Sequence, residues 1–344
     1  MTFKEIIEDN CDRNCKNQWW PRFAYHYTDI ENALTIIERH MLFSRTLAIE
    51  EKVMVNDNAN TNVIQNTGDA VNFVRLYFRP LTPTQYRNEG FKHPDLQYHQ
   101  KNNANVPVPV FFFFDLCHML ESIEGIVFSE MGQAGYGSPR FSTIEEFSKL
   151  NFKMIYSNGK MSNPDLEKRY RHAEILIPEK LDIDSCLTNI VCRSESEKKT
   201  LLNLLRERSK DAYLKYKNKI AIIKHGDMFY KNGLAIEDCI FNGKDIFITL
   251  MGTRAKTEYA MKEKKDGEHL RKLKAQIQIS WLLQDNTKII AGKRDFDMDY
   301  ESPTFYTIPN VDVPTGARSI FVKIWVENKL ICYMTQHLSP AAII

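Results

Sequence analysis

The sequence predicts an α+β protein in which a mixed domain of strands and helices precedes a C-terminal all-β, sandwich-like domain. Up to about residue 218, apolar runs of strand length alternate with segments whose apolar residues recur at helical spacing. Beyond Lys219 the chain changes to short runs separated by turn sequences such as QDNT and PTGA, and several of these runs alternate between apolar and polar residues. We therefore expect domains at residues 1–218 and 219–344.

The composition is that of a globular protein without a strong overall charge. Hydrophobic residues make up 43% of the chain and charged residues 26%, and 46 basic against 44 acidic residues leave a net charge of +2. Any surface for nucleic acid must therefore come from local clusters of charge and not from the overall balance.

The cysteines and the apolar segments bear on location. The seven cysteines are an odd number, scattered without a CxxC pair, which favours reduced thiols over a disulfide framework or a zinc site. The N-terminus is acidic and lacks the apolar core of a signal peptide, and the longest apolar run, Val106–Phe114, is too short to cross a bilayer. We expect a soluble, cytoplasmic protein that neither enters a membrane nor binds a metal.

Local patterns predict the elements of the first domain. Thr28 or Asp29 is placed to cap a helix, and Ser194 with Glu197 matches a capping box at the start of another. The run Val106–Phe114 is apolar on both faces and is expected to be a central strand. The other strands expected are Phe23–Tyr27, Val71–Phe78 and Phe152–Tyr156, and the helices are Ile30–His40, Ser142–Leu150 and Ser194–Tyr216.

Glu174 stands at the head of a short apolar run, Ile175–Ile177, that ends at Pro178. A run of this length predicts a buried strand, and the alternation of side chains puts Glu174 on the face opposite Ile175. A carboxylate in such a place is costly unless it is paired, exposed or used in catalysis. Two interpretations remain: an edge-strand glutamate with its head group in water, or a functional carboxylate.

His26 ends a predicted strand near the N-terminus, and Thr28 leads from it into a helix. A lone histidine in a strand is often a structural residue with satisfied hydrogen bonds. The order of strand, His, Thr and helix, followed later by Glu174, is what an NAD-cleaving transferase requires. Histidine and threonine can hold the nicotinamide-side ribose and amide, while the glutamate stabilises the cationic sugar that develops as nicotinamide leaves. Glycosidases use carboxylates for the same purpose.

Four stretches, in this order, resemble the DarT-type ADP-ribosyltransferase toxins, which modify bases in nucleic acid and are restrained by an antitoxin. The stretches are FAYHYTDIENALTIIERHMLFSR, VNFVRLYFRPLTPTQY, GIVFSEMGQAG, and the segment from RFSTIEEFSKLNFKMIY to RYRHAEILIPEKLDIDSCLTNIVC. The resemblance covers about residues 22–192 and rests on the ordered set, because no single motif is diagnostic. It implies an ADP-ribosyltransferase core built on a split, mainly antiparallel sheet, with NAD as co-substrate.

Residue by residue, the resemblance implies a site. Glu174 would be the catalytic glutamate, with His26 assisting, and the segment Ser157–Arg171 before it would be a loop that recognises the substrate. The positions that the resemblance implies for contact with NAD are His26, Thr28, Asn32, Tyr77 and Tyr86.

The sequence departs from the family at one functional arginine, which the family carries a few residues after an Ile-Gln pair. Here Ile64-Gln65 is followed by Asn, Thr, Gly and Asp at residues 66–69. Arg45 or Arg75 is a candidate to replace that arginine in space. If the arginine helps to remove a ring proton from thymine, its absence favours an exocyclic amine on a purine as the acceptor, since an amine needs no strong base before attack.

Two stretches are locally basic. Residues 204–219 hold six basic and two acidic residues, and residues 252–274 hold eight basic and four acidic residues. Tyr213 and Tyr216 interleave the first stretch, a mixture that suits a phosphate track with base-stacking rings, although a solvated helix face gives the same pattern. The residues expected to bind nucleic acid are Arg171, Arg206, Arg208, Lys210, Lys215 and Lys217.

These observations predict an NAD-dependent ADP-ribosyltransferase that acts as a toxin in a toxin–antitoxin or phage-defence module, with a cognate antitoxin as partner. A target base must be unpaired or extruded, so single-stranded DNA or RNA is the expected substrate. Two alternatives stay open: a catalytically degenerate binding protein, which the missing arginine favours, and a protein-modifying transferase. In the C-terminal domain, Trp281, Phe321 and Trp325 are expected in the core, and the sequence assigns that domain no function.

Overall fold

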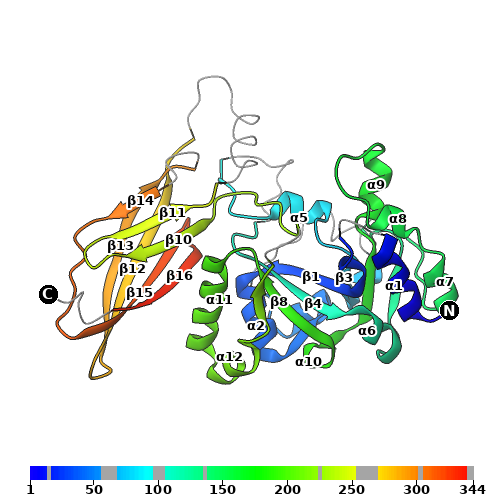
Figure 1. Cartoon of the computed structure of the whole chain (residues 1–344), viewed down its shortest axis with the longest axis horizontal. Coiled ribbons are helices and arrows are strands. Elements are labelled where there is room, and N and C mark those ends of the chain that lie inside the picture. Colours follow the sequence, from blue (N-terminus) through cyan, green and yellow to red (C-terminus); the bar gives the residue numbers. More distant parts are fainter. Residues whose placement is uncertain are drawn as a thin grey trace.

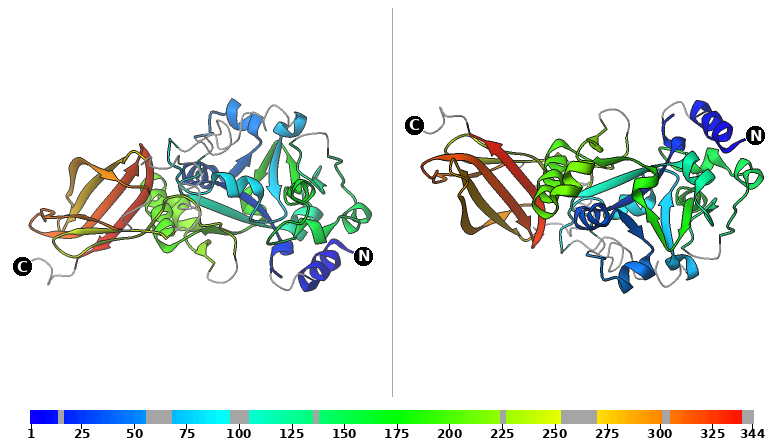
Figure 2. Two further views of the ribbon diagram at one scale, coloured as in Figure 1. Left: turned by 90° about the horizontal axis from the view of Figure 1, so that it is seen from above. Right: turned by 90° about the horizontal axis from the view of Figure 1, so that it is seen from below.

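The computed structural model describes residues 1–13, 17–55, 68–95, 105–134, 138–223, 227–252, 270–300 and 305–338. Two β-rich parts lie side by side, with helix α11 (Glu195–Arg208) standing between them (Figure 1). Helix α1 (Phe3–Arg13) lies at the end of the molecule remote from the C-terminal strands in every view (Figures 1 and 2).

A seven-stranded sheet with the order β5-β6-β3-β1-β4-β8-β9 forms the centre of the first part. Every pairing in it is antiparallel except that of β8 with β9, which confirms the mainly antiparallel sheet and the α+β class. A separate pair is formed by β2 (Met41–Phe43) and β7 (Lys180–Asp182). The strands of the large sheet are β1 (Phe23–Asp29), β3 (Phe73–Tyr77), β4 (Pro109–Asp115), β5 (Val127–Ser129), β6 (Glu174–Pro178), β8 (Leu187–Cys192) and β9 (Ile220–Ile222).

The sheet is split between β1 and β3. Strand β1 pairs with β4 along all seven of its residues, but it pairs with β3 only where Tyr25 lies opposite Tyr77. The two strands diverge after this pair, so His26 and Thr28 lie where the half-sheets separate. Strand β4 is buried on both faces, as expected for a central strand: Phe112 belongs to the main core and Phe111 to a second, smaller cluster.

Side-chain caps decide several helix boundaries. Asp29 caps α2 by accepting a hydrogen bond from the backbone of Glu31. The predicted strand at residues 152–156 is wrong: Asn151 caps a short helix there, α8, because its side chain accepts from the backbone N–H of Met154. The predicted single helix from Ser194 is broken by Ser209, whose hydroxyl caps a second helix. The helices besides α1 and α11 are α2 (Ile30–Arg39), α3 (Arg45–Glu50), α5 (Pro83–Asn88), α6 (Leu116–Ser122), α7 (Ile144–Ser148), α8 (Phe152–Ile155), α9 (Pro164–Tyr170), α10 (Ile183–Cys186) and α12 (Lys210–Tyr216), with 3-10 turns at Trp20–Arg22 and Gly68–Asn72.

No helix in the described ranges is long and apolar enough to cross a membrane.

The second part is all-β, as predicted, and consists of two antiparallel sheets. A three-stranded sheet has the order β10-β11-β14 and a four-stranded sheet the order β13-β12-β15-β16. Their inner faces pack together: the rings of Phe241 and Trp281, one from each sheet, are 5.6 Å apart in an edge-to-face arrangement. The strands are β10 (Ile236–Phe241), β11 (Ile246–Leu250), β12 (Leu273–Leu283), β13 (Lys288–Met298), β14 (Phe305–Ile308), β15 (Ala317–Val326) and β16 (Lys329–His337).

Two features of this part differ from the sequence-based expectation. Strand β9, which the sequence analysis assigned to the second domain, is instead the seventh strand of the first sheet. Trp281 lies in the core as predicted, but Phe321 and Trp325 are half-buried on the opposite face of the four-stranded sheet. Strand alternation sorts residues between two faces, but it does not say which face is covered.

Two glycines allow the chain to cross itself between the two parts. Phe91 and Leu234 exchange backbone hydrogen bonds of 2.8 and 3.3 Å, which brings the segment after α5 against the segment before β10. A Cβ on Gly90 would stand 1.8 Å from the carbonyl oxygen of Asn232, and one on Gly233 would stand 2.6 Å from that of Phe91. Both glycines also have positive φ, at 76° and 69°.

We predict that Gly90→Ala lowers the free energy of unfolding by more than about 3 kcal/mol, because it adds a clash with backbone to a left-handed conformation. Gly292→Ala is the matched control, since a Cβ there meets no atom within 4 Å. Urea unfolding of both variants measures the difference, and an equal, small loss would contradict the close crossing.

Candidate functional site

Glu174 is the first residue of β6, which lies between β5 and β3 in the interior of the sheet. Its side chain is only 1% exposed, so the interpretation as an edge-strand glutamate with a hydrated head group is wrong. Arg75 of β3 holds both carboxylate oxygens: its Nε donates to Oε2 at 3.0 Å and its Nη2 donates to Oε1 at 2.5 Å. A bidentate pair of this kind fixes the plane and the direction of the carboxylate.

Arg75 remains partly open to solvent, with 24% of its side chain exposed. Burial acts to lower the pKa of this guanidinium, but the neighbouring Glu174 carboxylate outweighs burial and raises the pKa. Arg75 therefore keeps its charge throughout the physiological range, and the carboxylate has a permanent counter-charge at the site.

Tyr77, Thr84 and His172 contact one another near the start of β6. Tyr77 lies directly opposite Glu174 in the sheet, and burial followed by the nearby carboxylate raises the pKa of its hydroxyl. His172 lies within hydrogen-bonding distance of Thr84 Oγ1 through Nε2, at 3.0 Å, and of the carbonyl of Lys168 through Nδ1, at 2.8 Å. The sequence analysis did not select His172 or Thr84, although a histidine two residues before Glu174 was a visible signal.

His26 connects β1 to the strand that carries Arg75. Its ring hydrogen-bonds the main chain of Arg75, and burial lowers the pKa of the imidazole to about 4, so the ring is neutral at physiological pH. The ring also lies 6.2 Å from that of Phe112. Thr28, two residues further on, is buried. The structure thus brings His26, Tyr77 and Glu174 to the split of the sheet, together with Arg75.

The positions linked with the missing arginine are only partly described. Ile64-Gln65 lies outside the described residues, whereas Asp69 is described and is held by Arg140 in two hydrogen bonds of 2.8 and 2.6 Å. Of the two replacements considered from the sequence, Arg75 contacts Glu174 directly, and Arg45 is the first residue of α3. Arg140 is a third arginine beside this segment, which the sequence analysis missed because 71 residues separate it from Asp69.

Two buried arginines hold the segment Ser157–Arg171. Arg79 donates to the carbonyls of Ile155 and Ser157, while Arg171 donates to Ser157 Oγ at 3.2 Å and to Glu167 Oε2 at 3.3 Å. Arg171 was expected to contact nucleic acid, but its side chain is buried and holds this segment from inside. The segment contains helix α9, so it is a supported structure and not an open loop.

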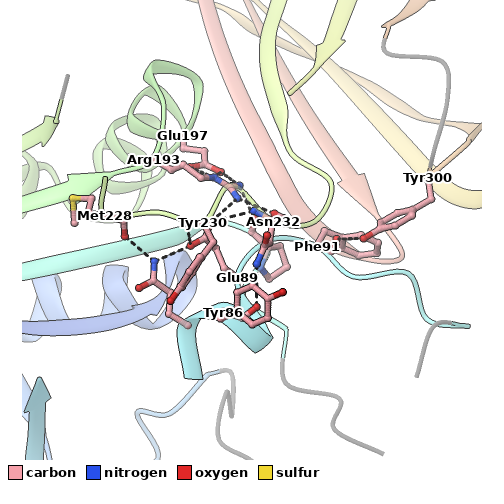
Figure 3. Close-up of polar contacts among 11 residues, drawn as sticks. Tyr86, Glu89, Phe91, Arg193, Glu197, Met228, Tyr230, Asn232 and Tyr300 are labelled. Carbon is pink, nitrogen blue, oxygen red and sulfur yellow. Dashed lines mark hydrogen bonds and ion pairs between the residues drawn. The ribbon is translucent and has the colours of Figure 1, made fainter. Parts of the chain in front are cut away.

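The residues expected near the NAD of the family continue along α2 and α5. The Oδ1 of Asn32 accepts a hydrogen bond of 3.1 Å from the backbone of Val55. Tyr86 is 41% exposed, and its ring stands 5.0 Å from that of Tyr230 in an edge-to-face contact. The carbonyl of Tyr86 accepts a hydrogen bond of 3.0 Å from the side chain of Asn232 (Figure 3). Residues beyond position 219 therefore hold the helix that carries Tyr86.

A buried cluster of charges lies behind this helix, formed by Glu89, Arg193 and Glu197, which we call the junction cluster (Figure 3). Arg193 is held by Glu197 and lies 3.6 Å from Glu89, and all three side chains are at most 2% exposed. Glu89 also accepts hydrogen bonds from the backbone of Tyr230 at 3.0 Å and of Asn232 at 3.3 Å. The cluster ties α5, the end of β8, the start of α11 and the segment before β10 to one another.

Helix α11 packs beside β8 and β9, at the edge of the sheet opposite to β6. The basic residues of α11 and α12 are therefore remote from Glu174. Arg208 holds Glu38 through hydrogen bonds of 2.9 and 2.7 Å, and Lys215 is paired with Asp184. Lys210 is exposed. Together with Arg171, which pairs with Glu167, three of the six residues expected to bind nucleic acid already have carboxylate partners.

Arg206 and Lys217 have a different environment, on either side of the ring of Tyr213. The Arg206 guanidinium carbon is 4.5 Å and the Lys217 ammonium 5.8 Å from the centre of that ring. Lys215 also lies 5.5 Å from the centre of the Tyr216 ring on α12, but its ammonium is paired with Asp184. The second basic stretch, residues 252–274, lies largely outside the described residues.

Among the residues that the structure describes, no group of three or more His, Cys, Asp or Glu side chains is arranged to hold a metal ion.

A buried carboxylate that lies opposite Tyr77, in register with the point where a mainly antiparallel sheet splits, is suited to stabilising the cation that forms when NAD loses nicotinamide. The class of the protein is that of NAD-dependent ADP-ribosyltransferases. A family model described as "ssDNA thymidine ADP-ribosyltransferase, DarT" matches residues 25–230, which is more than half of the chain. The chain belongs to the DarT family, as its sequence motifs indicated. No curated protein matches the chain significantly.

Solved structures of this family are similar to the chain at low sequence identity. Thermus sp. 2.9 DarT in complex with ADP-ribosylated ssDNA is 16% identical with a TM-score of 0.48, over 59% of this chain and 95% of that one. The same protein in complex with NAD+ gives 16% and 0.47, over 59% and 96%. Thermosipho africanus DarTG in complex with ADP-ribose gives 17% and 0.45, over 64% and 53%.

We predict that His172 makes stability depend on pH. Burial lowers the pKa of its imidazole from 6.5 to about 4, so between these values the unfolded chain binds a proton that the folded protein does not. The free energy of unfolding should therefore fall as the pH is lowered through this window, and His172→Gln should make the fall shallower. Thermal melting of both proteins between about pH 7 and pH 4.5 measures this.

The comparison between wild type and His172→Gln isolates this one group. The pKa of the Asp29 carboxyl is raised by burial to about 6, which makes stability change with pH in the opposite direction, but this effect is common to both proteins. The lowered pKa of His26 acts in the same direction as that of His172, and it too is common to both proteins. Parallel melting curves would show that His172 does not lose its proton on folding.

We predict that Arg193→Met costs about 3–5 kcal/mol of stability, because it leaves the carboxylates of Glu89 and Glu197 buried without their counter-charge. Arg208→Met, in the partly exposed ion pairs on α11, should cost less than about 1 kcal/mol. Chemical denaturation of the two variants tests the difference, and similar losses would mean that the junction cluster is not a buried ionic unit.

Proposed function

We propose that this protein transfers ADP-ribose from NAD to a base in single-stranded nucleic acid, and that it acts as a toxin in a toxin–antitoxin or phage-defence module. The observation that carries the proposal is the Glu174 carboxylate, buried at the split of the sheet and held in a fixed direction by Arg75. Membership of the DarT family supports nucleic acid as the acceptor and NAD as the donor.

Glu174 is the residue to which we assign the central role. As the bond between ribose C1′ and the nicotinamide nitrogen breaks, the electron pair leaves with nicotinamide and positive charge develops on the ribose. The carboxylate stabilises that charge more in the transition state than in the ground state, which is the condition for catalysis. A nitrogen of the base then donates its lone pair to C1′ and afterwards loses a proton. We assign the binding of NAD to His26, Thr28, Asn32, Tyr77 and Tyr86.

Arg75 is our candidate for the arginine that the family carries elsewhere. It contacts the catalytic carboxylate directly, and because its guanidinium stays protonated it can orient Glu174 and attract an anionic substrate, but it cannot remove a proton. A thymine ring nitrogen must lose its proton before or during attack, whereas an exocyclic amine of a purine does not. We therefore propose a purine amine, in RNA or single-stranded DNA, as the acceptor in place of thymine.

We further propose that residues 1–218 form the transferase domain and residues 219–344 an accessory domain, with β9 extending the transferase sheet. A cognate antitoxin is the protein partner that membership of this family suggests.

Glu174→Gln is expected to reduce transfer by about a thousandfold while the affinity for NAD changes little, because the amide keeps the shape of the carboxylate but carries no charge. The assay incubates full-length protein with NAD labelled in the ADP-ribose moiety and with single-stranded DNA, RNA or a protein lysate. Four homopolymers of each nucleic acid identify the base. Glu145→Gln, on the exposed side of α7, is the matched control.

The outcomes separate the alternatives. Label on purine homopolymers that disappears with Glu174→Gln supports the proposal, and label on thymine alone contradicts the choice of acceptor. Label only on protein indicates a protein-modifying transferase. Absence of label together with absence of NAD binding indicates a degenerate binding protein and refutes the proposed activity.

A further inference from the structure

The four-stranded sheet of the second part has one side that the three-stranded sheet does not cover, which we call the outer face, and α11 lies against its edge at β16. On β15 the residues Ile320, Val322 and Ile324 are fully buried in the core, and the alternate residues Phe321 and Trp325 are half-buried on the opposite side. Cross-strand partners extend this side over β12, where Gln276 lies opposite Trp325, Gln278 opposite Lys323 and Ser280 opposite Phe321.

Three lysines of the outer face each lie over an aromatic ring. The ammonium of Lys293 is 4.0 Å from the ring centre of Trp325, that of Lys288 is 5.8 Å from Phe321, and that of Lys323 is 4.5 Å from Tyr333. Lysines over rings are attracted to the negative face of the π system, and at exposed sites this attraction is weak. The ammonium groups of Lys293 and Lys288 can therefore be exchanged easily for another partner, whereas that of Lys323 is also paired with Glu207.

We propose that the outer face binds single-stranded nucleic acid, with bases stacked on Trp325 and Phe321 and phosphates held by Lys293 and Lys288. This inference rests on the proposed function in one respect, because it assigns a second binding surface to the same class of substrate. A base that stacks on Trp325 displaces the ammonium of Lys293 from the ring, and the long lysine side chain can then reach the phosphate of the same strand.

The spacing of the rings suits an extended strand. Phe321 and Trp325 are four residues apart on β15, which at about 3.3 Å per residue separates them by roughly 13 Å along the strand. One base cannot contact both rings, so each takes a different base of one strand. The amide of Gln278 lies between the rings and the edge strand β13, where it can bond to a base edge, whereas the amide of Gln276 donates a hydrogen bond of 2.9 Å to Asp295.

The charge on this side distinguishes nucleic acid from a protein partner. The outer face of the three-stranded sheet carries Ile240, Phe247 and Phe305, which are 48%, 39% and 64% exposed, but the described contacts place no lysine over these rings. That patch has the apolar character of a protein contact. In contrast, the aromatic groups of the four-stranded sheet lie among lysines, the combination that suits a strand with a π face on every base and a charge on every phosphate. The carboxylates on this face, Asp295 and Asp297, lie toward one end of β13 and are held by Gln276 and Lys274.

The outer face also continues toward the basic helices. Lys323 pairs with Glu207 at the end of α11, with 2.7 Å between Nζ and Oε2. The preceding residue, Arg206, lies over the ring of Tyr213 on α12. A second group of cations and an aromatic ring thus begins beside the sheet, and a strand longer than the sheet itself can follow both. Figure 2 shows α11 directly against β16, the strand next to β15.

The test measures binding by full-length Glu174→Gln protein, in which no transfer competes, to a fluorescein-labelled 20-nucleotide DNA strand of mixed sequence. Trp325→Ala and Phe321→Ala are each expected to weaken binding about five- to a hundredfold, and Lys293→Gln to reduce the slope of log affinity against log salt by about 0.7. An RNA strand of the same sequence should lose affinity to the same extent in these variants, because stacking does not distinguish the two sugars. The affinity for a DNA duplex of this sequence should not change.

Phe305→Ala and Lys244→Gln are the matched controls, an exposed aromatic residue on the other sheet and an exposed lysine in the turn between β10 and β11. Thermal melting confirms that each variant is folded. The proposal would be overturned if Trp325→Ala and Phe321→Ala proteins bound the strand as tightly as the controls. It would also be overturned if these two variants and the two controls all lost affinity equally.

The binding experiment can fail or succeed independently of the proposed transferase activity. Loss of binding with Trp325→Ala, if the protein with Glu174 intact transfers no ADP-ribose, would keep the surface and reject the activity. Transfer to a short oligonucleotide that persists while Trp325→Ala binds the 20-nucleotide strand normally would keep the activity and reject the surface.

Discussion

The ion pair between Arg75 and Glu174 is the contact on which the site depends. A carboxylate that is 1% exposed in the middle of a sheet is costly to bury, and the two charged hydrogen bonds from Arg75 offset that cost. Both residues are placed by the pairing of β3 with β6, so the geometry of the carboxylate is set by backbone hydrogen bonds and not by a mobile loop. Tyr77, which lies opposite Glu174, is also the residue at which β3 pairs with β1, so the carboxylate lies in register with the point where the sheet splits.

Buried charges recur wherever this protein must hold a loop or a helix in position. Arg79 and Arg171 donate hydrogen bonds to backbone carbonyls and to the Ser157 hydroxyl in the segment before Glu174. The junction cluster does the same for the helix that carries Tyr86 and for the chain that enters the second part. A buried guanidinium needs several acceptors with well-defined directions, so each of these contacts selects one arrangement of the surrounding chain.

The two parts of the molecule divide the requirements of a nucleic-acid-modifying enzyme. Chemistry at one base requires a small, rigid site, which the split sheet supplies with Glu174. Retention of a long polyanion requires an extended surface of cations and rings, and the outer face around Trp325 and Lys293 has those groups. The glycine crossing at Gly90 and Gly233 and the junction cluster join the two, so the position of one part relative to the other is set by direct contacts.

The sequence by itself determined what depends on neighbouring residues. The strand headed by Glu174, a helix cap at Thr28 or Asp29 and the all-β character of the C-terminal part follow from alternation and capping, which operate over a few residues, and the structure places the cap at Asp29. Over a segment as short as residues 152–156, a strand and a helix can show the same order of apolar residues, so periodicity could not distinguish them. The cap at Asn151 favours the helix.

Only the tertiary structure decided which groups meet. Arg75 and Glu174 are 99 residues apart, and Arg140 and Asp69 are 71 residues apart, so no local pattern could join them. Both faces of β15 carry large apolar residues in the sequence. The second sheet packs against one of them, so Phe321 and Trp325 lie on the other. Periodicity divides the residues of a strand between its sides, but the fold alone determines which side is covered, because that depends on elements far away along the chain.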